Sequence, residues 1–132
     1  MIKQKNLNLK PVEIAWLTGL LEGEGYFGID NRSVKRYKNS TVPASPYITI
    51  SMIDENFIAK LAKLVNKNYY SPSRKTATSK KVFICHVGDR PTLLYLLPHL
   101  LPHISKRRKK QIQNYINLLN QYVAWKNKQI NK

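Results

Sequence analysis

Acidic residues are scarce in this chain, which has 7 Asp and Glu among its 132 residues. None of them follows Asp89, and the 23 Lys and Arg leave a formal net charge of +16. A balance this basic indicates a polyanionic partner, most often a nucleic acid. Two of the few acids, Glu22 and Glu24, nevertheless lie in one short segment, which argues against a merely solvating role.

Cysteine is nearly absent as well. Cys85 is alone, which excludes a disulfide within the chain and fits a buried thiol in a reducing compartment. No apolar run approaches the roughly 20 residues that span a membrane, and the first residues, MIKQKNLNLKP, lack the apolar core of a signal peptide. We therefore expect an intracellular protein with one domain over residues 1–132.

The most informative segment is LTGLLEGEG at residues 17–25. It ends an apolar helical run that starts near Pro11, a residue suited to the first turn of a helix. Ala15, Gly19 and Gly23 recur at every fourth position and therefore share one helix face. Each glycine costs a helix about 1 kcal/mol relative to alanine, so this face predicts close packing against a second backbone.

The same segment closes with two carboxylates and a glycine. Gly25 is expected to end the helix, which places Glu22 and Glu24 in its last turn. The carbonyl-rich end of a helix repels anions. Acids at this position are unfavourable unless a cation, such as a metal ion, lies beside them.

Hydrophobic periodicity predicts the order helix, two strands, helix, two strands, helices. The strands are expected at residues 26–31, 47–52, 69–75 and 79–87, and the helices at residues 11–24, after Asp54, from Pro91 after Asp89, and around residues 112–123. Asp54 and Asp89 are expected to cap their helices, and Pro98 and Pro102 to kink or divide the third helix.

These elements predict an α/β (α+β) fold in which helices cover one face of a four-stranded antiparallel sheet. In the second strand, Ile48 and Ile50 alternate with Tyr47, Thr49 and Ser51, so the polar side chains line the other face. An open face of this kind suits a nucleic-acid groove. The facing of the run VFICHV at residues 82–87 stays open, because it is continuously apolar.

The segment 17–25 resembles the signature of the LAGLIDADG homing endonucleases, with Leu17, Gly19, Leu20 and Gly25 identical to it. The other five residues are conservative substitutions, and the signature occurs once. The resemblance implies the family's αββαββα fold and a site-specific double-strand DNA endonuclease, encoded in an intron or another mobile element. It also implies a homodimer on a pseudo-palindromic duplex, short 3′ overhangs, and cleavage with Mg²⁺ or Mn²⁺, for which Ca²⁺ is a non-cleaving substitute.

The resemblance also assigns residues to roles. Glu24 and the carbonyl of Gly23 match the metal ligands, and the face of Ala15, Gly19 and Gly23 matches the dimer interface. Family members carry a basic residue near the scissile phosphate. Alignment on Pro102 favours Arg107 for this position, whereas alignment on Gln111 favours Arg108.

By the same resemblance, DNA-contacting residues lie on the sheet and in basic segments. The candidates are Tyr26, Gly28, Asp30, Arg32, Lys35, Arg36, Tyr47, Thr49, Ser51, Arg74, Lys75, Lys80, Lys81, Lys106 and Lys109. The three histidines, His86, His99 and His103, are interpreted as core or surface residues, since they lack metal-finger spacing with Cys85.

One departure from the family pattern leaves a second function open. Many members place a water-ordering glutamine near the end of the second strand, where this chain has Met52. The alternative is therefore a nucleic-acid binder of the same fold that does not cleave, either an intron RNA maturase or a DNA-binding regulator. A small basic RNA-binding protein outside the family is a further alternative.

Overall fold

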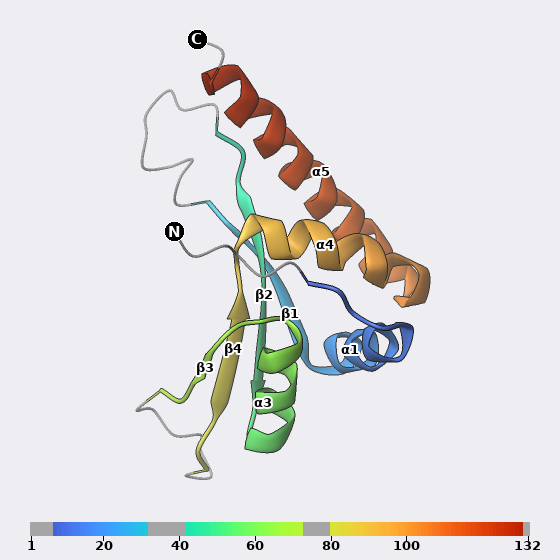
Figure 1. The fold of residues 1–132 in the computed structure, drawn as a ribbon, viewed down its shortest axis with the longest axis vertical. Helices are drawn as coiled ribbons and strands as arrows, with labels where there is room; N and C mark the ends of the chain where they lie inside the picture. The colour runs from blue at the N-terminus through green and yellow to red at the C-terminus, as the bar shows by residue number, and fades with distance from the viewer. Residues whose placement is uncertain (1–6, 32–41, 73–79, 131–132) are drawn as a thin grey trace. The chain divides into compact units, whose positions relative to one another are not determined.

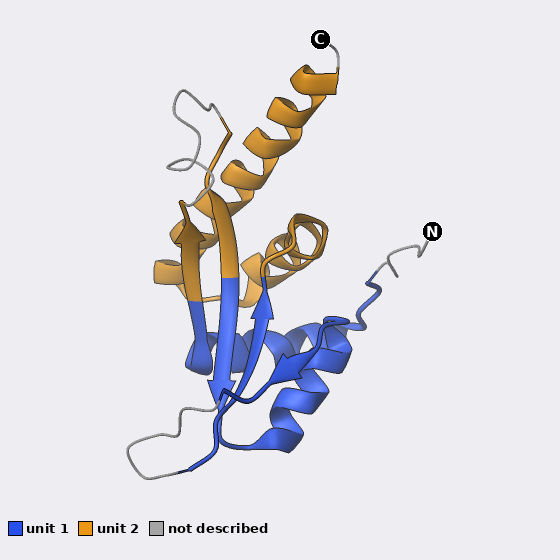
Figure 2. Cartoon of the chain, turned by 90° about the vertical axis from the view of Figure 1, so that its left-hand side faces the viewer, with its two compact units in different colours: residues 1–26, 48–87 blue, residues 27–47, 88–132 orange. Residues whose placement is uncertain are grey.

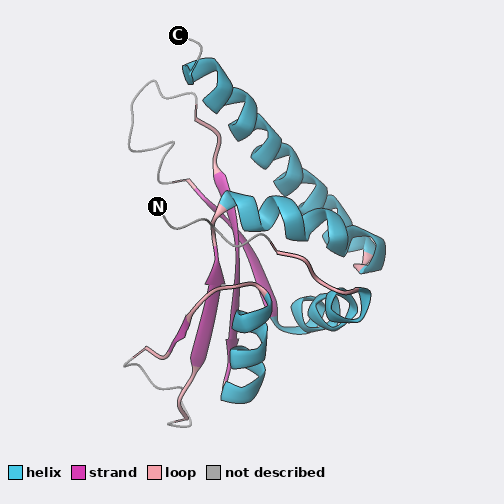
Figure 3. Cartoon of the chain, in the orientation of Figure 1, coloured by secondary structure: helices cyan, strands magenta, loops and turns pink. Residues whose placement is uncertain are grey.

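The structure is a computed structural model that describes residues 7–31, 42–72 and 80–130 (Figure 1). Its helices and strands follow the predicted order (Figure 3). They are α1 (Pro11–Glu24), β1 (Gly25–Asp30), β2 (Ser45–Met52), α3 (Glu55–Leu64), β3 (Tyr69–Tyr70), β4 (Phe83–Val87), α4 (Arg90–Leu100), the short 3₁₀ helix η1 (Leu101–His103) and α5 (Lys106–Ile130).

The four strands form one sheet in the order β1-β2-β4-β3. β4 pairs antiparallel with both of its neighbours, so that Ile50 of β2 lies opposite Cys85 and Thr49 lies opposite His86. The predicted α/β fold with a four-stranded antiparallel sheet is therefore confirmed.

The chain divides into two compact units (Figure 2). The first comprises residues 1–26 and 48–87, and the second comprises residues 27–47 and 88–132. β1 and β2 each contribute residues to both units, and the single domain expected over residues 1–132 stays a prediction.

The core of the first unit is built from α1, α3 and the strands. Leu17 and Leu21 of α1, Ile58 of α3 and Ile50 of β2 are buried. Asp54 caps α3 as predicted, since its Oδ1 accepts from the N–H groups of the first turn at 3.0 and 3.3 Å.

Cys85 is buried in this core, as expected for a thiol outside any disulfide. Burial raises the pKa of the Cys85 thiol from 9.0 to about 11, although the charge of Lys67 partly opposes the shift. The thiolate is the reactive form of cysteine, so this thiol is inert at neutral pH.

In the second unit α4 packs against α5. Leu93 and Leu97 of α4 and Ile112 and Leu119 of α5 are fully buried. Asp89 caps α4 as predicted: its Oδ2 accepts from the Thr92 N–H at 3.2 Å and from the Thr92 hydroxyl at 2.6 Å.

Proline positions explain two differences from the predicted elements. α4 continues through Pro98 and ends only at Leu100, because the buried Leu96, Leu97 and Leu100 hold the last turn despite one missing N–H. The division comes instead at η1, which contains Pro102.

β3 is also shorter than predicted and ends at Tyr70. Pro72 has no N–H for a strand ladder, and the hydroxyl of Ser71 donates to the Val82 carbonyl at 2.7 Å. β4 starts at Phe83 rather than at residue 79. Residues 73–79 lie outside the described residues.

Two glycines of β1 permit close approaches that a side chain would prevent. Gly25 ends α1 as predicted, and its φ of −79° is extended rather than left-handed. Its N–H donates to the Leu21 carbonyl oxygen, and an added Cβ would lie 2.6 Å from that oxygen. Gly28 is covered by the ring of Tyr47, and an added Cβ would come within 2.8 Å of three Tyr47 side-chain atoms.

These contacts predict different costs for two alanine substitutions. Gly25→Ala meets backbone, which cannot rotate away, so we expect it to lower the free energy of unfolding by about 1–3 kcal/mol. Gly28→Ala meets the far end of a half-buried tyrosine that can turn outward, so the expected loss is under about 1 kcal/mol. Urea unfolding followed by circular dichroism measures both. Equal losses, or a larger loss for Gly28→Ala, would contradict the assignment of the backbone contact.

No helix among residues 7–31, 42–72 and 80–130 is both long enough and apolar enough to cross a membrane.

Candidate functional site

The last turn of α1 is acidic. Glu24 ends the helix and is exposed, whereas Glu22 is half-buried, and the turn contains no basic residue. Glu24 has no hydrogen-bond or ion-pair partner among the residues that the structure describes. A carboxylate in this position adds negative charge to a helix end that is already negative, which leaves it suited to a cation.

A single chain brings few metal-ligating side chains together. Within the described ranges, no cluster of three or more His, Cys, Asp or Glu side chains is placed to hold a metal ion. The oxygen donors at the end of α1 are the Glu24 carboxylate and the last carbonyls of the helix, among which Gly23 is a candidate.

The predicted small-residue face of α1 is open. Ala15, Gly19 and Gly23 are all exposed, and a Cβ added to either glycine would meet no atom within 4 Å. The core side of the helix is instead made of Leu17, Thr18 and Leu21. α1 therefore presents a strip of bare backbone on the side away from its own core.

Within the first unit, β2 and β4 place polar side chains on one face of the sheet. The hydroxyl of Thr49 lies 3.0 Å from Nδ1 of His86, directly across the ladder. Ser51 lies opposite Ile84, which in turn lies opposite Tyr70 of β3. Since paired residues point to the same side of a sheet, these side chains share the open face.

His86 and Tyr70 were therefore missed as candidate site residues. Both are exposed, Tyr70 by 55%. The continuous apolar run of β4 gave no alternation from which to read the facing of His86. The facing of His86 follows only from the register of β2 and β4, in which the buried Ile50 lies opposite the buried Cys85.

In the second unit, the ring of Tyr47 covers Gly28. Gly28 is therefore buried beneath a tyrosine that is itself a predicted DNA contact, and Asp30 is half-buried nearby on the same strand. Tyr26, at the start of β1 in the first unit, is 62% exposed.

The start of α5 distinguishes the two candidate arginines. The guanidinium of Arg108 lies 4.7 Å from the ring centroid of Phe27, and Arg108 is half-buried. Gln111 donates to the Phe27 carbonyl at 3.5 Å and to the Tyr115 hydroxyl at 3.3 Å. Arg107 is exposed. The Arg108 side chain thus packs against Phe27, whereas the Arg107 side chain lies on the surface.

The other basic candidates are distributed between surface and unplaced segments. Lys80, Lys81 and Lys106 are exposed, and Lys109 is half-buried. The Lys81 ammonium lies 5.5 Å from the ring centroid of Phe83. The remaining candidates, Arg32, Lys35, Arg36, Arg74 and Lys75, lie outside the described residues.

No protein-family model and no curated protein matches the chain. Several solved structures do match it. The homing endonuclease I-CvuI in complex with its target has a TM-score of 0.59 at 15% identity, over 88% of this chain and 71% of that chain. The group I intron-encoded homing endonuclease I-CeuI complexed with DNA has a TM-score of 0.61 at 17% identity, over 91% and 59%.

A third match names the family of the fold. The LAGLIDADG homing endonuclease I-SmaMI bound to cleaved DNA has a TM-score of 0.58 at 14% identity, over 89% of this chain and 38% of that chain. Identities this low establish a likeness of fold. The chain therefore adopts the fold of the LAGLIDADG homing endonucleases.

Proposed function

We propose that the chain is a LAGLIDADG homing endonuclease that binds DNA site-specifically and cuts both strands. The observation that carries the proposal is the position of Glu24. Its carboxylate is exposed at the end of a helix whose glycine face is open, and the first strand of the sheet begins at the next residue. The fold is shared with endonucleases whose structures were solved with DNA.

The open face of the sheet supports the DNA-binding part of the proposal. It carries hydroxyl, imidazole and phenol groups, from Thr49, His86 and Tyr70, which can reach base edges in the major groove. The net charge of +16 supplies the attraction to phosphates. Lys80 and Lys81, which precede β4, are exposed and can make such contacts.

A divalent cation fits the end of α1. The Glu24 carboxylate and the Gly23 carbonyl are oxygen donors of the kind that Mg²⁺ prefers, and Mg²⁺ takes few protein ligands and keeps several waters. When bound, such an ion supplies charge stabilisation at the scissile phosphate and an activated water. I-CvuI structures are described with Ca and with Mg, the latter with uncleaved DNA.

Two copies of the chain complete the proposed site. One chain offers one Glu24, and pairing of two α1 helices along Ala15, Gly19 and Gly23 would bring two carboxylates together. The two like charges would repel each other unless a cation lay between them. I-SmaMI is long enough for a second region of this size beside the part that this chain matches. Short 3′ overhangs and an origin in an intron or other mobile element belong to the same proposal.

We assign the phosphate-contacting basic residue to Arg108 rather than to Arg107. The guanidinium of Arg108 lies 4.7 Å from the centroid of the Phe27 ring, and a guanidinium beside an aromatic ring can bind a phosphate through two N–H groups. Arg108 acts by electrostatic contact, because a guanidinium stays protonated and is a poor general base.

A second candidate function rests on Met52. This residue is half-buried opposite Phe83, and its thioether cannot order a water as the glutamine of many family members does. A protein of this fold that binds nucleic acid without cutting, as an intron RNA maturase or a DNA-binding regulator, would tolerate that difference.

For the proposed function, the first prediction concerns Glu24. Selection on a randomised duplex library with Mg²⁺ is expected to yield discrete double-strand cuts at pseudo-palindromic sites. Glu24→Gln keeps the size of the side chain but loses its charge, so we expect cleavage to fall at least about a hundredfold while DNA binding remains. Glu55→Gln, which alters an exposed acid of α3, is the matched control and should cut normally.

The other outcomes of this selection discriminate between the alternatives. Enriched sites without cuts in either protein would favour the non-cleaving binder, and RNA would be the next ligand to test. Cuts at sites without two-fold symmetry would contradict the homodimer.

The second prediction separates the two arginines. Arg108→Gln and Arg107→Gln remove the same charge two or three residues into α5. We expect Arg108→Gln to lower the cleavage rate at least about tenfold more than Arg107→Gln, since a charge-assisted contact is worth about 1.5–3 kcal/mol. Single-turnover cleavage of the selected site measures both rates. Equal losses would remove the special role of Arg108.

The third prediction concerns the Thr49–His86 pair. If the hydroxyl sets which imidazole nitrogen carries the proton, then Thr49→Val and His86→Ala should relax the preference at the same base pair, by about 1–3 kcal/mol of discrimination. Lys80→Gln is the control and should weaken binding to all sequences alike, with a salt slope smaller by about 1. Unchanged base preferences in both pair variants would exclude the pair as a sequence reader.

A further inference from the structure

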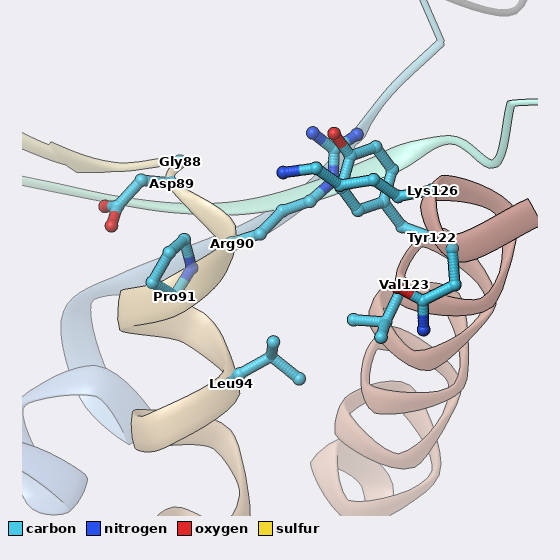
Figure 4. Close-up of a pocket in the computed structure, with 9 residues that line it drawn as sticks. Gly88, Asp89, Arg90, Pro91, Leu94, Tyr122, Val123 and Lys126 are labelled. Carbon is cyan, nitrogen blue, oxygen red and sulfur yellow. The ribbon is translucent and has the colours of Figure 1, made fainter. Parts of the chain in front are cut away.

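A cavity of about 410 Å³ lies in the second unit, between the start of α4 and the last turns of α5 (Figure 4). Its wall includes Arg90, Pro91 and Leu94 on one side and Tyr122, Val123 and Lys126 on the other. None of these residues has a role in the proposed DNA cleavage. The cavity is therefore a separate feature that needs its own explanation.

Two cations and a phenol converge in this cavity. The guanidinium of Arg90 lies 3.4 Å from the ring centroid of Tyr122, and Lys126 follows one helical turn later on α5. Figure 4 shows the ends of the Arg90, Lys126 and Tyr122 side chains pointing toward one another. Two like charges in the wall of one cavity favour an anion beside them.

The acid in the cavity wall caps α4. The carboxylate of Asp89 accepts from the N–H and hydroxyl groups of Thr92 as the cap of α4. In Figure 4 it points away from the ends of Arg90 and Lys126. Its charge is thus directed to the start of the helix, where an anion is favourable.

Arg90 also carries a buried donor without a partner. Nε of Arg90 is buried and has no hydrogen-bond partner among the described residues. Leaving a buried charged donor unpaired costs free energy, so this guanidinium is not neutralised by the protein atoms around its Nε. Phosphate suits the arrangement, because an arginine fork, an ammonium and a hydroxyl can each donate to one of its oxygens.

The apolar part of the cavity wall indicates that the ligand is larger than a phosphate ion. Pro91, Leu94 and Val123 give it an apolar side, and its volume is in the range of pockets that enclose small organic ligands. A bare phosphate ion would leave this apolar surface uncovered. A phosphate attached to a body of nucleotide size would use both parts.

We propose that this cavity is a binding site for a phosphate monoester of nucleotide size. Arg90, Lys126 and the Tyr122 hydroxyl bind the phosphate, and Pro91, Leu94 and Val123 contact the body. The same chemistry is offered by a free nucleotide and by the 5′-phosphorylated end of a nucleic-acid strand. The site does not depend on DNA cleavage or on a metal ion.

Isothermal titration of the full chain tests the proposal with adenosine 5′-monophosphate, adenosine and inorganic phosphate as probes. We expect one monophosphate per chain, with adenosine and inorganic phosphate each at least about tenfold weaker, a difference of about 1.4 kcal/mol. Lys126→Gln should weaken the monophosphate at least about fivefold, since it removes one charge-assisted contact. Lys126 is exposed, so this variant tests binding without the risk to folding of Arg90→Gln.

Lys128→Gln is the matched control, because it removes the same charge from an exposed position two residues further along α5. An equal loss in both lysine variants would overturn the site, because it would reduce the effect to general attraction by a basic chain. No binding of the monophosphate, or equal binding of adenosine, would overturn it as well.

A competition experiment then separates the two sources of the phosphate. A 5′-phosphorylated dinucleotide that displaces the monophosphate at equal or lower concentration would assign the site to a strand end. A dinucleotide at least about tenfold weaker would assign it to a free nucleotide. Both outcomes support the phosphate site.

Discussion

The close contact between Gly25 and the Leu21 carbonyl is the constraint on which the rest of the candidate site depends. The Gly25 N–H closes the last turn of α1 on that oxygen, and β1 begins at the same residue. Because a side chain at this position would collide with backbone 2.6 Å away, the helix can pass directly into the strand only with glycine there. The glycine therefore fixes where the helix ends. Glu24 is the last helical residue and lies immediately before the sheet.

The last turn of α1 contains two acids, Glu22 and Glu24, although the chain has few acids. A carboxylate at the carbonyl end of a helix is unfavourable by about 0.3–1 kcal/mol at an exposed site, and the last turn of α1 contains no basic residue to offset it. The cost is local, whereas the core side of the same helix, with Leu17 and Leu21, is well buried. A helix stabilised by its apolar side can thus carry a destabilising charge at its end, as expected where the charge serves a ligand rather than the fold.

Much of the fold was predictable because it is encoded locally. Asp54 and Asp89 cap the helices they precede, and the alternation of Ile48 and Ile50 gave the correct facing of β2. Long-range pairing was not predictable from the sequence. The facing of His86 depends on the register that places it opposite Thr49, and β4 is too uniformly apolar to reveal it. The proposed choice of Arg108 over Arg107 likewise rests on the contact with Phe27, a residue of a distant strand, which two alignments of one sequence could not supply.

The contact with Phe27 further suggests why an arginine rather than a lysine suits position 108. Three residues of α5 bind one residue of β1: Arg108 stacks on the Phe27 ring, Gln111 donates to its carbonyl, and Tyr115 packs against the ring at 6.4 Å between centroids. A planar guanidinium can stack on an aromatic face and still present N–H groups at its edge, whereas an ammonium offers only a point charge. The stack that helps attach α5 to β1 therefore also orients the cation. The same contact thus contributes to the packing of α5 against β1 and sets where the Arg108 guanidinium lies.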